Sequence, residues 1–274
     1  MTINGKTKIT GLFGHPVEHT LSPAMHNAAF QKLGLNYCYL PFHVHPDHLA
    51  DAVKGITALN FAGINVTVPH KEKVIPMLDE IHEEASFIGA VNTIVNSAGR
   101  LTGYNTDGRG FMRSLSEEGI AVEGRDIIII GAGGASRAIS YYLSQKAATL
   151  QLYDIDKEKV GKLASDLQQI RSNVSTADDL SAIARYHIII NATPLGLRKE
   201  DPLPLNTALL RKEQTVCDLI YRKTPLLEAA SIKGCVTMHG LGMLLWQGVF
   251  AFELWTGETP PVQVMRDALM SSIE

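Results

Sequence analysis

Two charged residues stand at positions where a side chain could move a proton. Lys71 follows a β-branched run in the stretch NVTVPHK, and residues 70–81 predict a helix whose first turn contains it. A cation there opposes the helix macrodipole, and Lys73 adds a second positive charge, so we expect the pKa of Lys71 to be lowered towards the working range. Asp107, in the stretch YNTDGRGF, could share this proton work. Each residue has a plainer alternative, namely a solvent-facing lysine and an aspartate that caps the next helix.

A glycine-rich segment, GAGGASRA, follows a run of four isoleucines and opens a helical pattern. This order of strand, turn and helix is typical of a dinucleotide-binding fingerprint, in which backbone N–H groups at the helix N-terminus hold a pyrophosphate. An acid ends the next predicted strand, where it can bind the cofactor ribose. A purely structural glycine turn is the alternative. The expected cofactor-binding residues are Gly131, Gly133, Gly134, Ala135, Ser136 and Asp154.

Short β-like runs alternate with helical patterns along the chain, which predicts an α/β protein with parallel sheets. In the first part we expect strands at 7–14, 37–44 and 62–68, helices at 23–33 and 46–57, and a hairpin at 90–104. A helix at 107–119 leads into further strands at 126–130, 149–153, 187–191, 215–218 and 235–238. We therefore expect three parts: an N-terminal α/β domain at 1–107, a Rossmann dinucleotide-binding domain at 108–239, and C-terminal helices at 240–274 that pack back on the first domain; the family resemblance described below implies that the first of these binds the substrate.

The composition narrows the class of protein. The 274-residue chain has 45% hydrophobic and 19% charged residues and a net charge of −3, which is typical of globular proteins and does not indicate a nucleic acid or an anionic membrane as partner. The N-terminus has no apolar signal core, and the three cysteines have neither disulfide nor zinc spacing, so we expect a cytoplasmic protein. His43, His45 and His48 lie close together without a supporting cysteine, and we expect no metal site there.

Several stretches together make the chain resemble the shikimate dehydrogenase family from end to end. They occur in the family's order and cover both expected domains: GHPVEHTLSPAMHN, NVTVPHK, AVNT, YNTDG, GAGGASRA, NATPLG, DLIYRKTPLL and GLGMLLWQG. The resemblance implies reversible NAD(P)H-dependent reduction of 3-dehydroshikimate to shikimate, in the biosynthesis of aromatic amino acids. It makes Lys71 and Asp107 the catalytic pair.

The resemblance also implies the residues that bind the substrate. Thr20 and Ser22 match two hydroxyls that hold its carboxylate, and Tyr221 matches a tyrosine near that group. Residues that match partners of the substrate hydroxyls are Thr67, Asn92 and Gln247. Such side chains suit a small polyol acid. Gly242, in GLGMLLWQG, is expected to be a cofactor-binding residue.

Two departures from the family pattern bear on specificity. Thr20 stands where a serine is common, so a quinate/shikimate dehydrogenase is the main enzymatic alternative. Asp154, Ile155 and Asp156 stand where NADP-dependent members carry Asn-Arg-Thr, and a carboxylate there would repel a 2′-phosphate, so we expect NAD to be favoured over NADP.

Other readings remain open beside the resemblance. A non-catalytic NAD-responsive binding module is the rival from another class, and the intact Lys71 and Asp107 pair argues against it. A methylene-tetrahydrofolate dehydrogenase would share the architecture but would not explain the hydroxyl-rich set. We expect a monomer or a homodimer.

Overall fold

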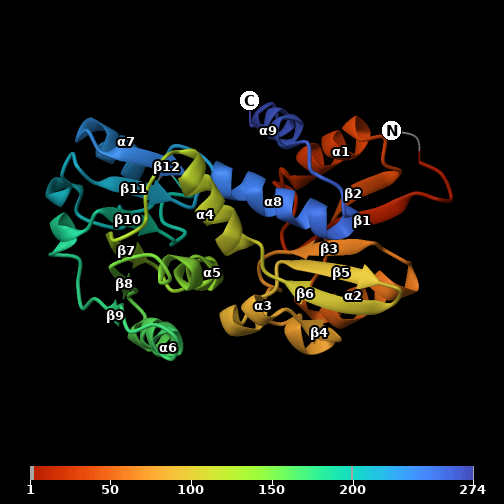
Figure 1. The fold of residues 1–274 in the computed structure, drawn as a ribbon, viewed down its shortest axis with the longest axis horizontal. Helices are drawn as coiled ribbons and strands as arrows, with labels where there is room; N and C mark the ends of the chain where they lie inside the picture. Colours follow the sequence, from red (N-terminus) through yellow and green to blue (C-terminus); the bar gives the residue numbers. More distant parts are fainter. Residues whose placement is uncertain (1–2, 199, 274) are drawn as a thin grey trace. The chain divides into compact units, whose positions relative to one another are not determined.

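The fold of the chain consists of two compact units (Figure 1). The structure is a computed structural model that describes residues 3–198 and 200–273. Unit 1 comprises Met1–Thr106 and Leu245–Glu274, and unit 2 comprises Asp107–Leu244. We expected the return to the first domain at residue 240, but the division falls inside helix α8 (Leu241–Thr256), whose first turn belongs to unit 2.

Unit 1 is built on one sheet, whose described strands have the order β2-β1-β3-β5-β6-β4. Its other elements before the crossing are α1, α2, α3 and two short 3-10 helices. The bounds are β1 Lys8–Gly14, α1 Ser22–Lys32, β2 Tyr37–His43, η1 Pro46–His48, α2 Leu49–Ala58, β3 Gly63–Val66, η2 Ile75–Met77, β4 Glu80–Ile81, α3 Glu83–Ile88, β5 Thr93–Ser97 and β6 Arg100–Tyr104.

The pairing of these strands brings several loops to one edge of the sheet. β1 pairs in parallel with β2 and with β3, so the segments that follow these three strands lie at the same edge. β5 is antiparallel to β3 and begins at this edge, and β6 returns to it, because Thr93 pairs with both Asn65 and Tyr104. The predicted hairpin is therefore present. Its two central residues, Ala98 and Gly99, have positive φ values of 53° and 92°, as a two-residue hairpin turn requires.

Helix α9 (Val262–Met270) and the part of α8 from Leu245 onwards belong to unit 1. The indole N–H of Trp255 donates a hydrogen bond to the carbonyl of Ile94 at 3.0 Å. A Cβ at Gly63 would lie 2.2 Å from the same indole nitrogen, so only glycine allows this approach. Helix α9 lies beside α1 (Figure 1). The core of unit 1 is thus completed by residues far away in sequence.

Unit 2 is a parallel sheet with the described strands in the order β12-β11-β10-β7-β8-β9. This order reverses at β7, as in a doubly wound dinucleotide-binding fold. The bounds are α4 Asp107–Glu117, β7 Asp126–Ile130, α5 Gly134–Leu143, β8 Thr149–Tyr153, α6 Lys157–Gln168, β9 Val174–Thr176, η3 Ile183–Arg185, β10 Ile188–Asn191, η4 Thr207–Leu209, β11 Thr215–Asp218, α7 Pro225–Ile232 and β12 Val236–His239.

The expected α/β class is confirmed in both units, and local sequence explains several element boundaries. β7 is a buried isoleucine run, typical of a strand covered on both faces. Asp156 begins α6 by accepting a hydrogen bond from the N–H of Lys159 at 3.0 Å. Thr224 caps α7 in the same way, and Pro225 occupies the first helical position.

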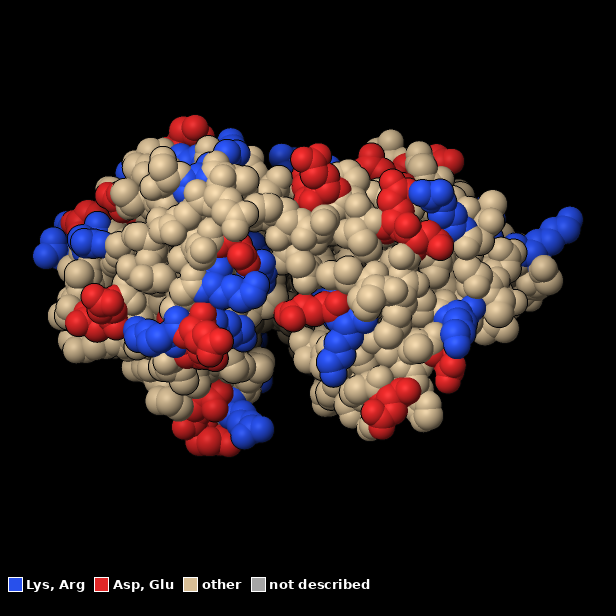
Figure 2. All heavy atoms as spheres, turned by 90° about the horizontal axis from the view of Figure 1, so that it is seen from below, with Lys and Arg blue, Asp and Glu red and all other residues tan. Residues whose placement is uncertain are grey.

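The charged residues do not form a field of one sign on the face seen in Figure 2, where acidic and basic side chains alternate. The net charge of −3 agrees with this mixed surface. None of the helices within the described residues has the length and apolar character needed to cross a bilayer.

Candidate active site

The strand-end edge of unit 1 gathers most of the residues expected to bind substrate. Thr20 and Ser22 follow β1, Thr67 and Lys71 follow β3, and Asn92 immediately precedes β5. The sheet pairing explains this convergence, because each of these positions adjoins a strand end at the same edge. Residues separated by about seventy positions in sequence are thus collected on one side of the unit.

The first loop presents two hydroxyl groups in sequence. The backbone N–H of Ser22 donates a hydrogen bond to the hydroxyl oxygen of Thr20 at 3.4 Å. Ser22 is the first residue of α1, with Pro23 after it, and is only 6% exposed. The hydroxyl of Thr20 therefore lies against the backbone at the start of α1, next to the residue that carries the second hydroxyl.

The segment around Lys71 differs from the prediction. The expected helix at 70–81 is wrong: the residues form turns, then η2 (Ile75–Met77) and the short strand β4. Pro76 within this segment explains the outcome, because proline disrupts a helix interior. The helix macrodipole therefore cannot act on Lys71. Its place is set instead by the turn, in which the N–H of Val91 donates to the carbonyl of Lys71 at 2.8 Å.

Asn92 is held in one orientation by its neighbours. Its side-chain oxygen accepts a hydrogen bond from the backbone N–H of Thr106 at 2.8 Å, and its side-chain nitrogen donates to the Thr106 hydroxyl at 2.9 Å. Both residues are buried, with exposures of 3% and 1%. Thr106, the partner of this amide, directly precedes Asp107, the first residue of unit 2.

The glycine-rich loop of unit 2 fits the phosphate group of a dinucleotide. Gly131 has φ +106°, and a Cβ there would lie 2.9 Å from the carbonyl of Ala192, so this position requires glycine. At Gly133 and Gly134, by contrast, a Cβ would meet nothing within 4 Å. The N-terminus of α5 therefore opens onto free space, into which its unpaired N–H groups can bind an anion. Ser136 is fully buried, as the small residue of this helix start.

Asp154 holds the glycine-rich loop to the end of β8. Its carboxylate accepts a hydrogen bond from the N–H of Ala132 at 2.7 Å and another from the N–H of Asp156 at 3.0 Å. Asp154 does not cap α6, because Asp156 has that role. Ile155 is 87% exposed and carries no charge. Lys157 is engaged elsewhere: it donates to the carbonyl of Asp178 at 2.8 Å.

The remaining expected residues lie on different parts of the two units. In unit 2, Asp107 begins α4, and Tyr221 follows β11 with 49% of its surface exposed. The pKa of Tyr221 is raised by desolvation and, second, by the charge of Asp107. Gly242 packs on α4, where a Cβ would lie 2.9 Å from that of Ser114. Gln247, on the part of α8 in unit 1, is partly buried.

A buried carboxylate, Asp218, was missed by the sequence reasoning. It is fully buried at the end of β11 and accepts hydrogen bonds from the amide of Asn191 at 3.1 Å, the hydroxyl of Thr224 at 2.7 Å and the N–H of Ile220 at 3.1 Å. Burial raises its pKa, and the same hydrogen bonds oppose that rise. Asp218 therefore joins the NATPLG loop to the DLIYRKT loop. Each of these two motifs carries polar residues, Asn191 in the first and Asp218 and Thr224 in the second. These polar residues were the signal in the sequence that could have indicated the contact.

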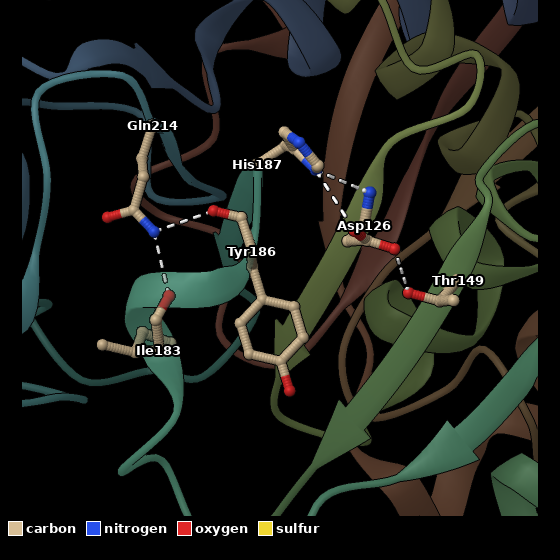
Figure 3. Close-up of polar contacts among 6 residues, drawn as sticks. All are labelled: Asp126, Thr149, Ile183, Tyr186, His187 and Gln214. Atoms are coloured by element: carbon tan, nitrogen blue, oxygen red, sulfur yellow. Dashed lines mark hydrogen bonds and ion pairs between the residues drawn. The ribbon is translucent and has the colours of Figure 1, made fainter.

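A second polar cluster lies at the opposite edge of the unit 2 sheet (Figure 3). Thr149 donates a hydrogen bond to the carboxylate of Asp126 at 2.6 Å, and the N–H of Asp126 donates to Nδ1 of His187 at 3.0 Å. Nearby, the amide of Gln214 donates to the carbonyls of Ile183 and Tyr186. The hydroxyl is paired with the carboxylate rather than with the imidazole, so it is not activated as a nucleophile. The hydrogen bond between Asp126 and Thr149 joins the first residues of the neighbouring strands β7 and β8.

No group of three or more His, Cys, Asp or Glu side chains within residues 3–198 and 200–273 has a geometry that could hold a metal ion. His43 is the last residue of β2, and His45 follows two residues later. Each lies near a carboxylate: His43 is 3.4 Å from Glu18, and His45 is 3.3 Å from Asp47.

Comparison with known proteins identifies the family. Two family sequence models match: the shikimate dehydrogenase substrate binding domain over residues 12–94, and the shikimate 5′-dehydrogenase C-terminal domain over residues 240–270. The shikimate dehydrogenase (NADP(+)) of Desulforamulus reducens is 50% identical over 283 residues, which cover 99% of this chain and 97% of that protein. The chain belongs to the shikimate dehydrogenase family.

Solved structures of the family share the whole architecture. Shikimate dehydrogenase from Aquifex aeolicus is 41% identical, with a TM-score of 0.93 over 97% of this chain and 99% of its own. A quinate dehydrogenase from Corynebacterium glutamicum in complex with NAD is 33% identical, with a TM-score of 0.90 over 97% of this chain and 99% of its own. Membership of the shikimate dehydrogenase family, expected from the motifs, is thus confirmed. Neither comparison assigns a role to an individual residue of this chain.

Proposed function

We propose that this protein catalyses the reversible reduction of 3-dehydroshikimate to shikimate with a nicotinamide cofactor. The observation that carries the proposal is the strand-end edge of unit 1, where Thr20, Ser22, Thr67, Lys71 and Asn92 converge. Hydroxyl, amide and ammonium groups can satisfy one carboxylate and several alcohols without any metal ligand among them. Family membership supports the same substrate class.

The cofactor, when bound, supplies hydride to the substrate carbonyl carbon. The glycine-rich loop of unit 2 would hold its pyrophosphate through backbone N–H groups of Gly133 and Gly134. The carbonyl oxygen must gain one proton as its carbon gains hydride, and the reverse reaction must remove that proton. We assign this proton to Lys71 and Asp107. Thr20 and Ser22 are proposed to hold the carboxylate, while Thr67, Asn92, Gln247 and Tyr221 bind and orient the rest of the substrate.

We further propose that NAD is preferred over NADP, although the relative from D. reducens is named for NADP(+). The loop after β8 supports this. Asp154 puts a carboxylate at the strand end, Ile155 has no charge to meet a 2′-phosphate, and Lys157 is engaged with the carbonyl of Asp178. A ribose hydroxyl can donate to a carboxylate, whereas a phosphate is repelled by it.

Steady-state rates test both parts of the proposal. Purified protein should reduce NAD when shikimate is added, as followed by the absorbance of the reduced cofactor, and kcat/KM should be higher with NAD than with NADP. Changing Asp154→Asn, Ile155→Arg and Asp156→Thr together should shift the ratio towards NADP. Asp156→Thr alone is the matched control, because threonine can still cap α6. A higher kcat/KM with NADP for the unaltered protein would contradict the preference.

Quinate is a second candidate substrate, favoured by Thr20 and by the likeness to a quinate dehydrogenase. The same assay with quinate measures this directly. If the methyl group of Thr20 affects tolerance of the extra hydroxyl of quinate, Thr20→Ser should change the ratio of kcat/KM for the two acids. An unchanged ratio would assign the discrimination to other residues.

A further inference from the structure

Two buried polar residues of the unit 1 sheet have no role in the proposed mechanism. Asn65 is the third residue of β3, and Thr93 is the first residue of β5. They are partners in the antiparallel pairing of these strands, so their side chains lie on the same face of the sheet. Their exposures are only 4% and 0%. Buried polar groups need hydrogen-bond partners, and the partners of these two residues include the proposed substrate ligand Asn92.

The backbone fixes the orientation of the Asn65 amide. The carbonyl of Asn92 can only accept, so the side-chain atom of Asn65 that lies 3.1 Å from it is the nitrogen. The same nitrogen lies 3.0 Å from the hydroxyl oxygen of Thr93. The side-chain oxygen of Asn65 accepts from the phenol of Tyr39 at 2.9 Å. Asn65 therefore directs one N–H to the Asn92 carbonyl and the other to the Thr93 hydroxyl.

The proton of the Thr93 hydroxyl then has one short path. Because its oxygen accepts from Asn65, the hydroxyl must donate its single proton to another acceptor. The side-chain oxygen of Asn92 lies 3.0 Å away, whereas the hydroxyl oxygen of Thr106 lies 3.5 Å away, beyond the usual length of an O–H···O hydrogen bond. Thr93 therefore donates to the side-chain oxygen of Asn92.

These bonds occupy the oxygen of the Asn92 amide. It accepts from the backbone N–H of Thr106 at 2.8 Å and from the hydroxyl of Thr93 at 3.0 Å. A third donor, the hydroxyl of Thr106, is farther away at 3.3 Å. A carbonyl oxygen has two lone pairs, so the two shorter bonds use its capacity. Asn92 can therefore meet a substrate oxygen only from the nitrogen side of its amide.

We propose that Thr93 is a positioning residue that holds the Asn92 amide in one orientation, and that Asn65 orients the Thr93 hydroxyl for this task. The inference rests on the proposed function, in which Asn92 binds a substrate hydroxyl. It gives that contact a direction, because Asn92 donates an N–H and the substrate oxygen accepts. The amide is set before the substrate arrives, so binding does not have to order it.

The test separates the hydroxyl of Thr93 from its methyl group. Thr93→Val removes the hydroxyl and keeps the shape, whereas Thr93→Ser keeps the hydroxyl and removes the methyl group. For Thr93→Val we expect KM for shikimate, and the Kd of shikimate in calorimetry, to rise about fivefold, as for loss of one hydrogen bond of ordinary net strength. The value of kcat should stay within about twofold, because a contact made equally in the ground and transition states changes KM alone.

Two controls accompany this variant. Thr93→Ser should keep KM within about twofold, because serine can still donate to Asn92. Thr10→Val removes a hydroxyl from an equally buried threonine of the same sheet, which donates to the carbonyl of Cys38 at 3.3 Å. This second control should keep both kcat and KM.

A double-mutant cycle shows whether Thr93 acts through Asn92. In an Asn92→Ala background, Thr93→Val should change KM by less than about twofold. If Thr93→Val does not fold, the pair Tyr39→Phe and Asn65→Leu removes the donor that orients the Thr93 hydroxyl. In this pair the carbonyl of Asn92 keeps its bond from the N–H of Val66 at 2.8 Å. The pair should also raise KM and should lose its effect in the Asn92→Ala background.

The outcomes separate this inference from the proposed function. Unchanged KM and Kd in Thr93→Val, with or without a lower melting temperature, would overturn the inference, and so would an equal rise in Thr93→Ser, which would assign the effect to packing. An equal effect of Thr93→Val with and without the Asn92 amide would also overturn it. If the unaltered protein binds shikimate in calorimetry but oxidises neither shikimate nor quinate, the proposed function fails alone, and the Kd values of the variants decide the inference. If it binds neither acid, both fail.

Discussion

A buried histidine should make unit 1 sensitive to acid. His26 is fully buried between aromatic rings of Tyr39, Phe252 and Trp255. Neither of its ring nitrogens has a hydrogen-bond partner within the described part of the chain. Burial lowers its pKa from 6.5 to about 3, because an imidazolium cannot be solvated there. Folding therefore requires neutral His26.

The sign and size of the effect follow from proton linkage. Between pH 6.5 and 3, His26 is protonated in the unfolded chain but neutral in the folded unit, so the unfolded state binds one more proton and the free energy of unfolding falls as pH falls. The slope approaches about 1.4 kcal/mol per pH unit between these pKa values, and lowering the pH from 6.5 to 4.5 should cost about 2.3 kcal/mol. Well above pH 6.5 His26 is neutral in both states, and this contribution no longer changes with pH.

Urea titrations followed by tryptophan fluorescence measure this effect in the right unit, because both tryptophans, Trp246 and Trp255, belong to unit 1. His26→Phe keeps an aromatic ring in the stack but has no group that titrates. Between the two pKa values, the slope of its free energy of unfolding against pH should be smaller than that of the unaltered protein by about 1.4 kcal/mol per pH unit. His19→Gln is the matched control, since His19 is exposed. Equal slopes in the unaltered protein and in His26→Phe would refute the reasoning, whatever their common value.

Three further changes test single features of the site. Lys71→Ala should lower kcat by roughly 10²- to 10⁴-fold with little change in KM, whereas Lys73→Ala should not; near-normal kcat in the first would end the proton-transfer role. Gly108→Ala would put a Cβ 2.3 Å from the carbonyl of Ala138 and should lower the free energy of unfolding by about 1–3 kcal/mol in urea titrations. Asp218→Asn replaces an acceptor of three donors and should cost a similar amount in the same assay; an unchanged free energy of unfolding would show that these hydrogen bonds do not stabilise the two loops.

Most strands could be predicted because their signals are local. The isoleucine run of β7 and the strand at Thr215–Asp218 need no distant partner to be recognised. The exact crossing between units could not be predicted. Helix α8 is apolar around its whole circumference, so nothing in its sequence indicates that its first turn belongs to unit 2 and the remainder to unit 1.

The site was predicted as a set of residues, but its internal connections were not. Family resemblance pointed to Asn92, yet it did not indicate what holds this residue in place. The side chain of Asn65 bonds both the hydroxyl of Tyr39 and the carbonyl of Asn92 only because β2, β1 and β3 are neighbours in the sheet. Such hydrogen bonds depend on register between strands distant in sequence, which no local pattern encodes.

The turn that carries Lys71 takes the place of the helix on which the local argument for this residue rested. The side chain of the preceding residue, His70, contacts the carbonyl of Val44 beyond the end of β2 at 2.8 Å, and the N–H of His70 bonds the carbonyl of Thr67. The lysine is therefore fixed by contacts to two strand ends rather than by a helix. Those contacts hold it at the edge where parallel strands direct their ligand-binding loops. The proposed role of Lys71 in proton transfer thus depends on sheet topology and not on the helix macrodipole that first suggested it.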